Sequence, residues 1–199
     1  MNTTHMSTTQ EPVLLTRPKR ADALRNYEKV LAAAREAFAE GGEATSLEEI
    51  ARRAGVGIGT LYRNFPNRQA LLEALYIDEV EDLCRAATEL DGIEPWAALT
   101  GWFDRFIAYM ATKRALAAEL LNYLTGDAEL FQTCRASMFA AGEPLLLRAQ
   151  EAGVVRTDVS IADVIQLVIG IGKLQSNQPG QTEHLVHVAL DGLRYRSES

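Results

Sequence analysis

Residues 46–65, SLEEIARRAGVGIGTLYRNF, leave room for only two short helices with a tight turn between them. Ser46, followed three positions later by Glu49, is a capping-box signal for a helix start. Gly55 ends that helix. The second helix must stop near Phe65, because the next residue is a proline. The segment therefore predicts two helices that cross within twenty residues.

Such a crossing restricts particular positions. Ala51 falls where the helices approach, so its side chain must be small, and Gly55 falls in the turn, where a positive φ favours glycine. Val56 and Leu61 are placed to fill the wedge between the helices. The pattern is typical of a DNA-binding helix-turn-helix, although any corner of two helices needs the same small and aliphatic residues.

The rest of the chain also has helical rather than strand periodicity. Apolar residues recur at three- and four-residue intervals, and we found no alternating strand pattern. The predicted fold is all-α with about nine helices: an N-terminal three-helix helix-turn-helix domain and a C-terminal helical domain. The expected helices span residues 22–40, 46–55, 57–65, 67–90, 95–111, 113–124, 127–151, 158–175 and 181–195. The expected regions are a disordered N-terminus (1–16), a DNA-binding domain (17–66), a connecting helix (67–90) and a ligand-binding and dimerisation domain (91–199).

Charge is distributed unevenly over the 199 residues. The net charge is −7, yet residues 17–76 hold ten Lys/Arg against eight Asp/Glu, a net +2, while residues 77–199 hold ten against eighteen, a net −8. A mildly basic first third on an acidic body suits a protein that meets phosphate with one end only. No apolar run reaches the ~18 residues of a membrane span. With two cysteines and no secretory signal pattern, the expected location is the cytoplasm.

The run TSLEEIARRAGVGIGTLYRNFPNRQALL, residues 45–72, resembles the DNA-binding domain of TetR-family regulators. The LYxxF block, followed by a polar cap and a basic residue, carries most of the resemblance, which extends back over residues 20–40. Two positions depart from the family pattern: Gly57 often is Ser, and Ile58 often is polar. These departures leave base specificity open.

The resemblance implies roles for individual residues. The helix start at Thr45 and Ser46 would face a phosphate, and the next helix would enter the major groove. A basic arm would reach the minor groove, unless it is only a solvated linker. The implied DNA-binding residues are Thr45, Ser46, Gly57, Ile58, Gly59, Thr60, Tyr62, Arg63, Asn64 and Arg68, with Arg17, Lys19 and Arg20 in the arm.

Two features of the second half indicate a ligand site and a dimer interface. Aromatic and sulfur-containing side chains on the helices after residue 95 belong either to the core or to an apolar pocket: Trp102, Phe106, Tyr109, Met110, Tyr123, Phe131, Cys134 and Met138. The strongly apolar segment 161–172 and the last helix form an expected dimer interface: Ile161, Ile165, Val168, Ile169, Gly172, Leu185, Ala189 and Leu193.

The resemblance implies a homodimeric repressor that binds a palindromic operator on double-stranded DNA and responds to an apolar small molecule. It implies no cofactor and no membrane partner. His184, His187 and Asp191 have a spacing that could hold a metal, but a third strong ligand is missing, so no metal is expected. Two alternatives stay open: a DNA-binding or architectural protein of the same fold without a ligand, and a helical enzyme or carrier. No catalytic motif supports the enzyme.

Overall fold

The computed structural model describes residues 17–41, 44–124, 128–174 and 180–194, and over these ranges it contains helices and no strand. The expectation for residues 1–16 lies outside the described residues. Eight α-helices follow one another in these ranges: α1 (Ala21–Gly41), α2 (Leu47–Arg53), α3 (Ile58–Asn64), α4 (Arg68–Glu89), α5 (Pro95–Leu120), α6 (Glu129–Glu151), α7 (Ile161–Gly172) and α8 (Gln181–Asp191).

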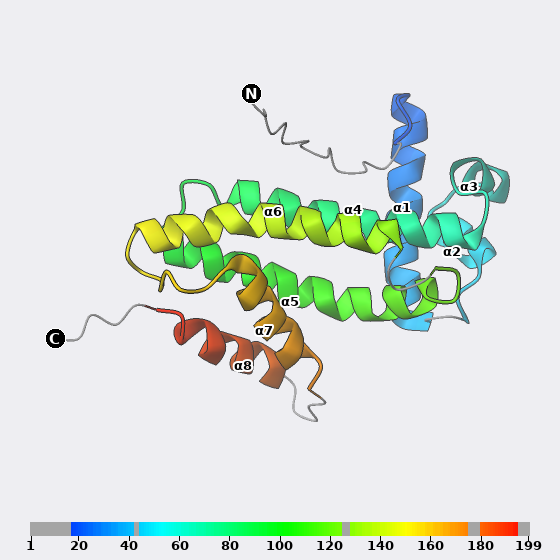
Figure 1. Cartoon of the computed structure of the whole chain (residues 1–199). Helices are drawn as coiled ribbons and strands as arrows, with labels where there is room; N and C mark the ends of the chain where they lie inside the picture. Colours follow the sequence, from blue (N-terminus) through cyan, green and yellow to red (C-terminus); the bar gives the residue numbers. More distant parts are fainter. Residues whose placement is uncertain (1–16, 42–43, 125–127, 175–179, 195–199) are drawn as a thin grey trace, which may run out of the picture.

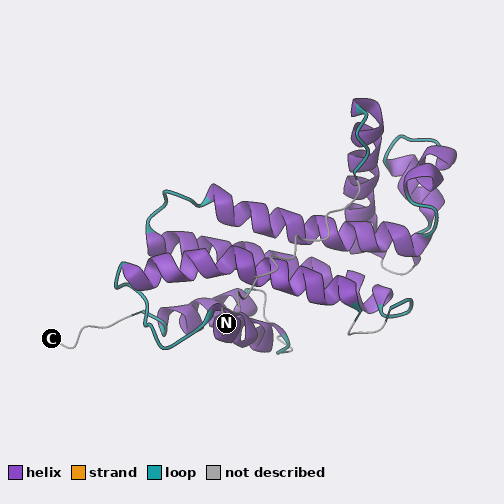
Figure 2. Cartoon of the chain, turned by 45° about the horizontal axis from the view of Figure 1, so that its top comes forward, coloured by secondary structure: helices purple, strands orange, loops and turns teal. Residues whose placement is uncertain are grey.

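The helices form two groups. Helix α1 stands across one end of the long helices, and α2 and α3 pack beside it (Figure 1). Helices α4, α5 and α6 run side by side and pack against each other, while α7 and α8 pack below them (Figure 1). Figure 2 shows the same separation after rotation, with α1–α3 gathered at one end. The predicted all-α class is therefore correct.

Helix α4 connects the two groups because it contacts α1 as well as α5 and α6. Its start is set locally: the Asn67 side chain accepts a hydrogen bond from the Ala70 amide at 2.8 Å, as the sequence predicted. Buried Leu71, Leu72 and Leu75 then continue the core of the first group into that of the second.

One prediction of helix bounds was wrong. The sequence pattern suggested separate helices at 95–111 and 113–124, whereas α5 is continuous from Pro95 to Leu120. Its start has a clear local cause, since Pro95 occupies the first turn and the Glu94 carboxylate accepts from the Trp96 and Ala97 amides. Its later turns are anchored by Leu116 and Leu120, both fully buried.

Candidate nucleic-acid interface and ligand groove

The turn between α2 and α3 has the geometry that its sequence requires. Gly55 adopts a φ of +65°, the left-handed region that disfavours a residue with a side chain. The Ser46 hydroxyl accepts from the Glu49 amide at 3.1 Å and so starts α2. Gly57 is the N-cap of α3 and makes no side-chain capping bond, as expected for a glycine in place of a hydroxyl residue.

Helix α3 buries one face and presents the other to solvent. Leu61 and the following Phe65 are buried in the core with α1 and α2. Ile58 and Tyr62, on the side of α3 that faces solvent, remain 39% and 43% exposed. An aliphatic and an aromatic side chain kept together on the surface of a short helix indicate a surface that meets a partner.

The polar residues of this face are partly held by their own helix. Arg63 is exposed and donates from Nε to the Gly59 carbonyl at 3.0 Å, and Asn64 donates from Nδ2 to the Thr60 carbonyl at 2.9 Å. Both side chains therefore lie along α3 and are hydrogen-bonded to its own backbone. Gly57, Gly59 and Ser46 are exposed, and Thr60 is half-buried.

Thr45 and Arg68, both predicted to contact phosphate, make contacts within the protein: Thr45 is buried and Arg68 is half-buried. The Thr45 hydroxyl is buried and donates to the Ala37 carbonyl at 2.9 Å. Arg68 donates to Glu119 and to the Thr45 carbonyl, and its guanidinium lies 5.0 Å from the ring centroid of Phe38. These contacts join α1, α4 and α5, so the role of Arg68 in the structure is to hold the two helix groups together.

The residues of the predicted basic arm also differ in their surroundings: some are exposed and one is paired within the protein. Lys19 and Arg20 are exposed, as a minor-groove arm would require. Arg17 points to α4, where its Nη2 lies 2.7 Å from Asp78 Oδ1 and 2.7 Å from Glu81 Oε2. Arg35 of α1 pairs with the same Asp78 at 3.0 Å and with Glu79. Ion pairs to α4 therefore fix the segment that precedes α1 and the middle of α1.

Most of the residues expected to line a ligand pocket form the core of the second helix group. Trp102 and Phe106 are fully buried, and the Trp102 indole donates to the Leu83 carbonyl at 3.1 Å. A Cβ at Gly142 would lie 2.7 Å from the Trp102 ring, so α6 packs directly on that ring. Tyr109 and Met138 are also buried, Met110 and Phe131 are half-buried, and Tyr123 is 46% exposed.

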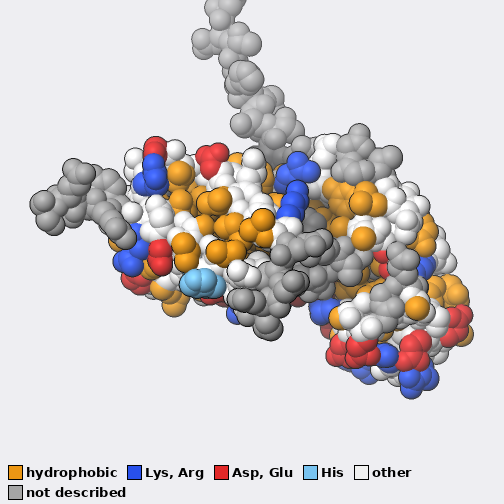
Figure 3. Space-filling view, turned by 90° about the horizontal axis from the view of Figure 1, so that it is seen from below, with side chains coloured by type: hydrophobic (Ala, Val, Ile, Leu, Met, Phe, Trp, Pro, Cys, Tyr) orange, Lys and Arg blue, Asp and Glu red, His pale blue; other side chains and the backbone are white. Residues whose placement is uncertain are grey.

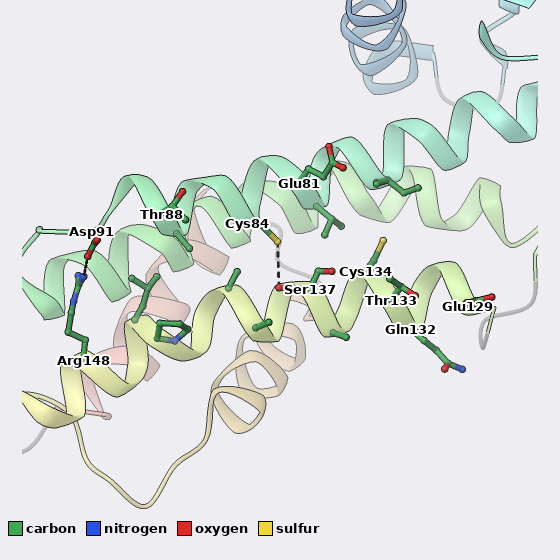
Figure 4. A pocket seen from close by; sticks show the side chains of 18 residues that line it. Glu81, Cys84, Thr88, Asp91, Glu129, Gln132, Thr133, Cys134, Ser137 and Arg148 are labelled. Carbon is green, nitrogen blue, oxygen red and sulfur yellow. Dashed lines mark hydrogen bonds and ion pairs between the residues drawn. The ribbon is translucent and has the colours of Figure 1, made fainter. Parts of the chain in front are cut away.

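The structure instead forms a groove of about 1040 Å³ between α4 and α6. Figure 4 shows the side chains of both helices along it, with Asp91 and Arg148 at one end and Gln132 and Glu129 at the other. Of the eight residues proposed from the sequence, Cys134 alone lines it. The groove exists because the facing residues are small. The sequence signal for it is the cluster Ala136, Ser137, Ala140 and Ala141, which the aromatic pattern obscured.

In the middle of the groove, the thiol of Cys84 on α4 contacts the backbone carbonyl of Ser137 on α6. Cys84 Sγ donates to the Ser137 carbonyl at 3.5 Å, the contact drawn in Figure 4. Burial raises the pKa of the Cys84 thiol to about 11, so this group is neutral near pH 7. The Cys84 thiol therefore adds no charge to the middle of the groove.

Several residues expected at the dimer interface are buried within their own chain. Ile161, Ile165, Val168 and Leu193 belong to the core, and a Cβ at Gly172 would lie 2.9 Å from Met110 Cε. Ile169, Leu185 and Ala189 are half-buried. The outer face of α7 and α8, together with the residues just after α7, presents other apolar side chains, which are exposed: Leu167, Leu174 and Val188.

Figure 3 views the molecule from the side of α7 and α8 and shows hydrophobic side chains gathered there beside a histidine. His187 Nε2 lies 3.0 Å from Asp104 Oδ1 of α5, and His184 is exposed. Gly170 lies on this outer side with open space around the position of a Cβ. In the part of the chain that the structure describes, no helix is long and apolar enough to cross a membrane.

A short exposed helix presented by a helix-turn-helix, joined to a second helical body, defines a DNA-binding regulator. Comparison with known proteins identifies the family. Residues 30–75 match the family model "Bacterial regulatory proteins, tetR family", and residues 94–195 match "Transcriptional regulator SbtR-like, C-terminal domain". The chain belongs to the TetR family of transcriptional regulators.

Solved structures agree. The TetR transcriptional regulator SCO0520 from Streptomyces coelicolor is 39% identical with a TM-score of 0.76, covering 86% of this chain and 99% of that one. A TetR regulatory protein from Mycobacterium vanbaalenii is 36% identical with a TM-score of 0.73, covering 89% and 100%. The Transposon Tn10 TetC protein of Escherichia coli is 31% identical over 86 residues, 42% of this chain and 44% of that protein. The match to this curated relative thus spans less than half of its length.

Proposed function

We propose that the chain is a repressor that binds a palindromic operator as a homodimer and releases it when a small molecule occupies the second helix group. In this proposal residues 17–66 are the DNA-binding domain, 67–90 the connecting helix and 91–199 the effector-binding and dimerisation domain. The observation that carries the proposal is the exposed face of α3, where Ile58 and Tyr62 stand beside Arg63.

That face has the chemistry of major-groove recognition. Ile58, in the first turn of α3, suits contact with a thymine methyl, and Arg63 suits the acceptors of guanine. The Tyr62 hydroxyl and the exposed Ser46 at the start of α2 suit phosphate oxygens. Gly57 and Gly59 add no bulk, so the backbone of the helix start can approach the base edges closely.

The dimer is supported by the outer face of α7 and α8. Leu167 of α7, Leu174 just after α7 and Val188 of α8 are about half exposed, which is costly for large aliphatic side chains in a monomer. Gly170 lies beside them and lets another helix approach. A second copy packed here would pair two α3 helices, which must lie ~34–36 Å apart to enter successive major grooves.

The test is selection of DNA fragments by the purified protein, followed by equilibrium binding to the best site at several salt concentrations. We expect an inverted repeat, one dimer per site, and affinity that falls steeply with salt, because several phosphates are neutralised in each half-site. Equal affinity for the selected site and for random duplex would refute operator recognition. Release by no compound in a broad metabolite screen would refute the effector response and leave a ligand-free DNA-binding protein.

A further inference from the structure

We propose that the groove between α4 and α6 binds an elongated aliphatic molecule with a cationic end group, such as a long-chain alkylammonium ion, and that Glu81 transmits its binding to α1. This inference rests on the proposed effector response and deepens it by naming the chemical class of the effector.

The shape of the groove favours a chain over a ring system. From Glu129 to Arg148 it follows α6 for about 28 Å. Its middle is lined by small and aliphatic side chains, among them Val80, Ala136 and Ala140. None of the described residues that line it carries an aromatic ring. A flexible aliphatic chain fills a long, narrow apolar space and gains affinity from the area removed from water, whereas a flat ring finds no stacking partner here.

The charges along the groove favour a cation. Three carboxylates line it, Glu81, Asp91 and Glu129, against the single guanidinium of Arg148. That guanidinium is already occupied: Nη1 lies 3.0 Å from Asp91 Oδ1, and Nη2 donates to the carbonyls of Leu90 and Ile93. In the other half of the groove an anionic head group would meet the exposed carboxylate of Glu129 and the carboxylate of Glu81, which is paired with Arg17 at 2.7 Å.

Arg148 is the group on which an anionic ligand would depend. Its Nε is buried and has no acceptor among the described residues, so one donor remains at that end of the groove. That N–H lies at the opposite end of the groove from Glu129, whose carboxylate is exposed in the first turn of α6 (Figure 4). The comparison of matched cationic and anionic probes decides this point directly.

Glu81 connects the groove to the DNA-binding helices. Its side chain lines the groove, and in Figure 4 its carboxylate turns away from α6. There Oε2 lies 2.7 Å from Nη2 of Arg17, which is four residues before the first residue of α1, Ala21. A cationic head group near Glu81 competes with Arg17 for the same carboxylate and repels its guanidinium. Binding therefore weakens the ion pairs that fix α1, which packs against α2 and α3.

The probes are decyltrimethylammonium and decyl sulfate, which share one chain length and differ in head-group charge, with tetramethylammonium as the chain-free control. Isothermal titration is performed on the full chain without DNA and below the micellar concentration. We expect saturable binding of decyltrimethylammonium at one molecule per chain. Decyl sulfate should bind about tenfold more weakly, because attraction is replaced by repulsion at a partly exposed site. Tetramethylammonium should not bind.

Two variant pairs locate the site. Ala140→Trp fills the groove at an exposed position and should abolish binding, whereas Leu147→Trp, exposed on α6 but outside the groove, should not. Glu81→Gln should reduce the preference for the cationic probe several-fold, while Asp82→Asn, on α4 but not in the groove, should leave it unchanged. Circular dichroism checks that each variant is folded.

The outcomes separate this inference from the proposed function. Equal or tighter binding of decyl sulfate, or full binding by Ala140→Trp, overturns the cationic groove. Binding of decyltrimethylammonium without any loss of operator affinity overturns the transmission through Glu81. If decyltrimethylammonium does not bind but another compound releases DNA, the ligand class is wrong and the effector-responsive repressor stands.

Discussion

Arg68, the first residue of α4, donates from Nε to Glu119 Oε1 of the last turn of α5 at 2.5 Å, with side chains 20% and 7% exposed. The same guanidinium donates to the Thr45 carbonyl, just before α2. One side chain thus connects the start of the helix-turn-helix to the second helix group. A movement of α5 relative to α4 must therefore break this pair or carry α2 with it.

Removing the carboxylate of Glu119 should lower the free energy of unfolding more than removing the carboxylate of an exposed ion pair. Glu119→Ala leaves the half-buried Arg68 without its carboxylate, and we expect a loss of about 2–3 kcal/mol in the free energy of unfolding. Urea denaturation measures it. Asp158→Asn, which removes the partner of Arg156 in an exposed pair, serves as the control and should change stability little. An equal effect of the two substitutions would contradict the role of Arg68 as the connection between the helix groups.

Two residues of α3 should separate affinity from specificity. Tyr62→Phe removes a hydroxyl proposed to bond phosphate and should weaken binding to all duplexes alike. Arg63→Ala should cost about 1–3 kcal/mol at the selected operator and relax the preference at particular bases. Competition binding on a library of single-base operator variants measures both. Tyr123→Phe, an exposed tyrosine on a different helix group, should bind like the wild type; a base-specific loss with Tyr62→Phe would reverse these assignments.

The local parts of this structure could be predicted from the sequence. Gly55, Ser46 and Asn67 act through their own backbone or that of residues three positions away, so their roles follow from spacing alone. The role of Arg68 could not be predicted in the same way. Its partner Glu119 is 51 positions away, and only the packing of α4 on α5 brings the two together.

The groove and the outer face of α7 show that the burial of individual side chains could not be predicted from the sequence alone. Aromatic residues such as Trp102 suggested a ligand pocket, but in the structure their side chains are packed in the core and fill that space themselves. The groove forms where side chains are small, at Ala136 and Ala140. Likewise Gly170 and Gly172 look equivalent in the sequence. In the structure Gly172 packs on Met110 within the chain, and Gly170 faces open space.

Stability should fall as the pH falls through the acidic range. Arg52 and Arg53 hold the pKa of Glu49 down to about 2, and hydrogen bonds from Ser160 lower the pKa of Asp163. A carboxylate with a lowered folded pKa contributes stability that is fully present above its unfolded pKa, near 4.5 for Glu49, and that is lost as the pH falls toward 2. The melting temperature should therefore drop between about pH 5 and pH 3.

The Glu49→Gln variant measures how much Glu49 contributes to this pH dependence. Its melting temperature should fall less steeply over the same pH range than that of the wild type. Asp78 acts in the opposite direction: burial, the largest influence, raises its pKa, so protonation of Asp78 offsets part of the loss. Thermal melts at half-unit pH steps provide the measurement. Parallel slopes for Glu49→Gln and wild type would show that the two arginines contribute nothing to the acid response.

Substitutions on the two sides of α7 should have different consequences. Leu167 is 44% exposed on the outer face, whereas Ile165 is 1% exposed in the core. Leu167→Asp places a charge in the proposed dimer contact and should yield folded monomers. Ile165→Asp buries an unpaired charge within the chain and should unfold it, with a loss of about 3–5 kcal/mol. Ile93→Asp, at an exposed position outside α7 and α8, is the control and should remain dimeric.

Sedimentation equilibrium over a range of concentrations gives the oligomeric state, and circular dichroism gives the fold. The Leu167→Asp monomer should also lose most of its affinity for the full operator, because one α3 helix reads one half-site and the gain from joining two half-sites disappears. A Leu167→Asp protein that is folded, dimeric and fully active on the operator would place the dimer contact elsewhere than on α7 and α8.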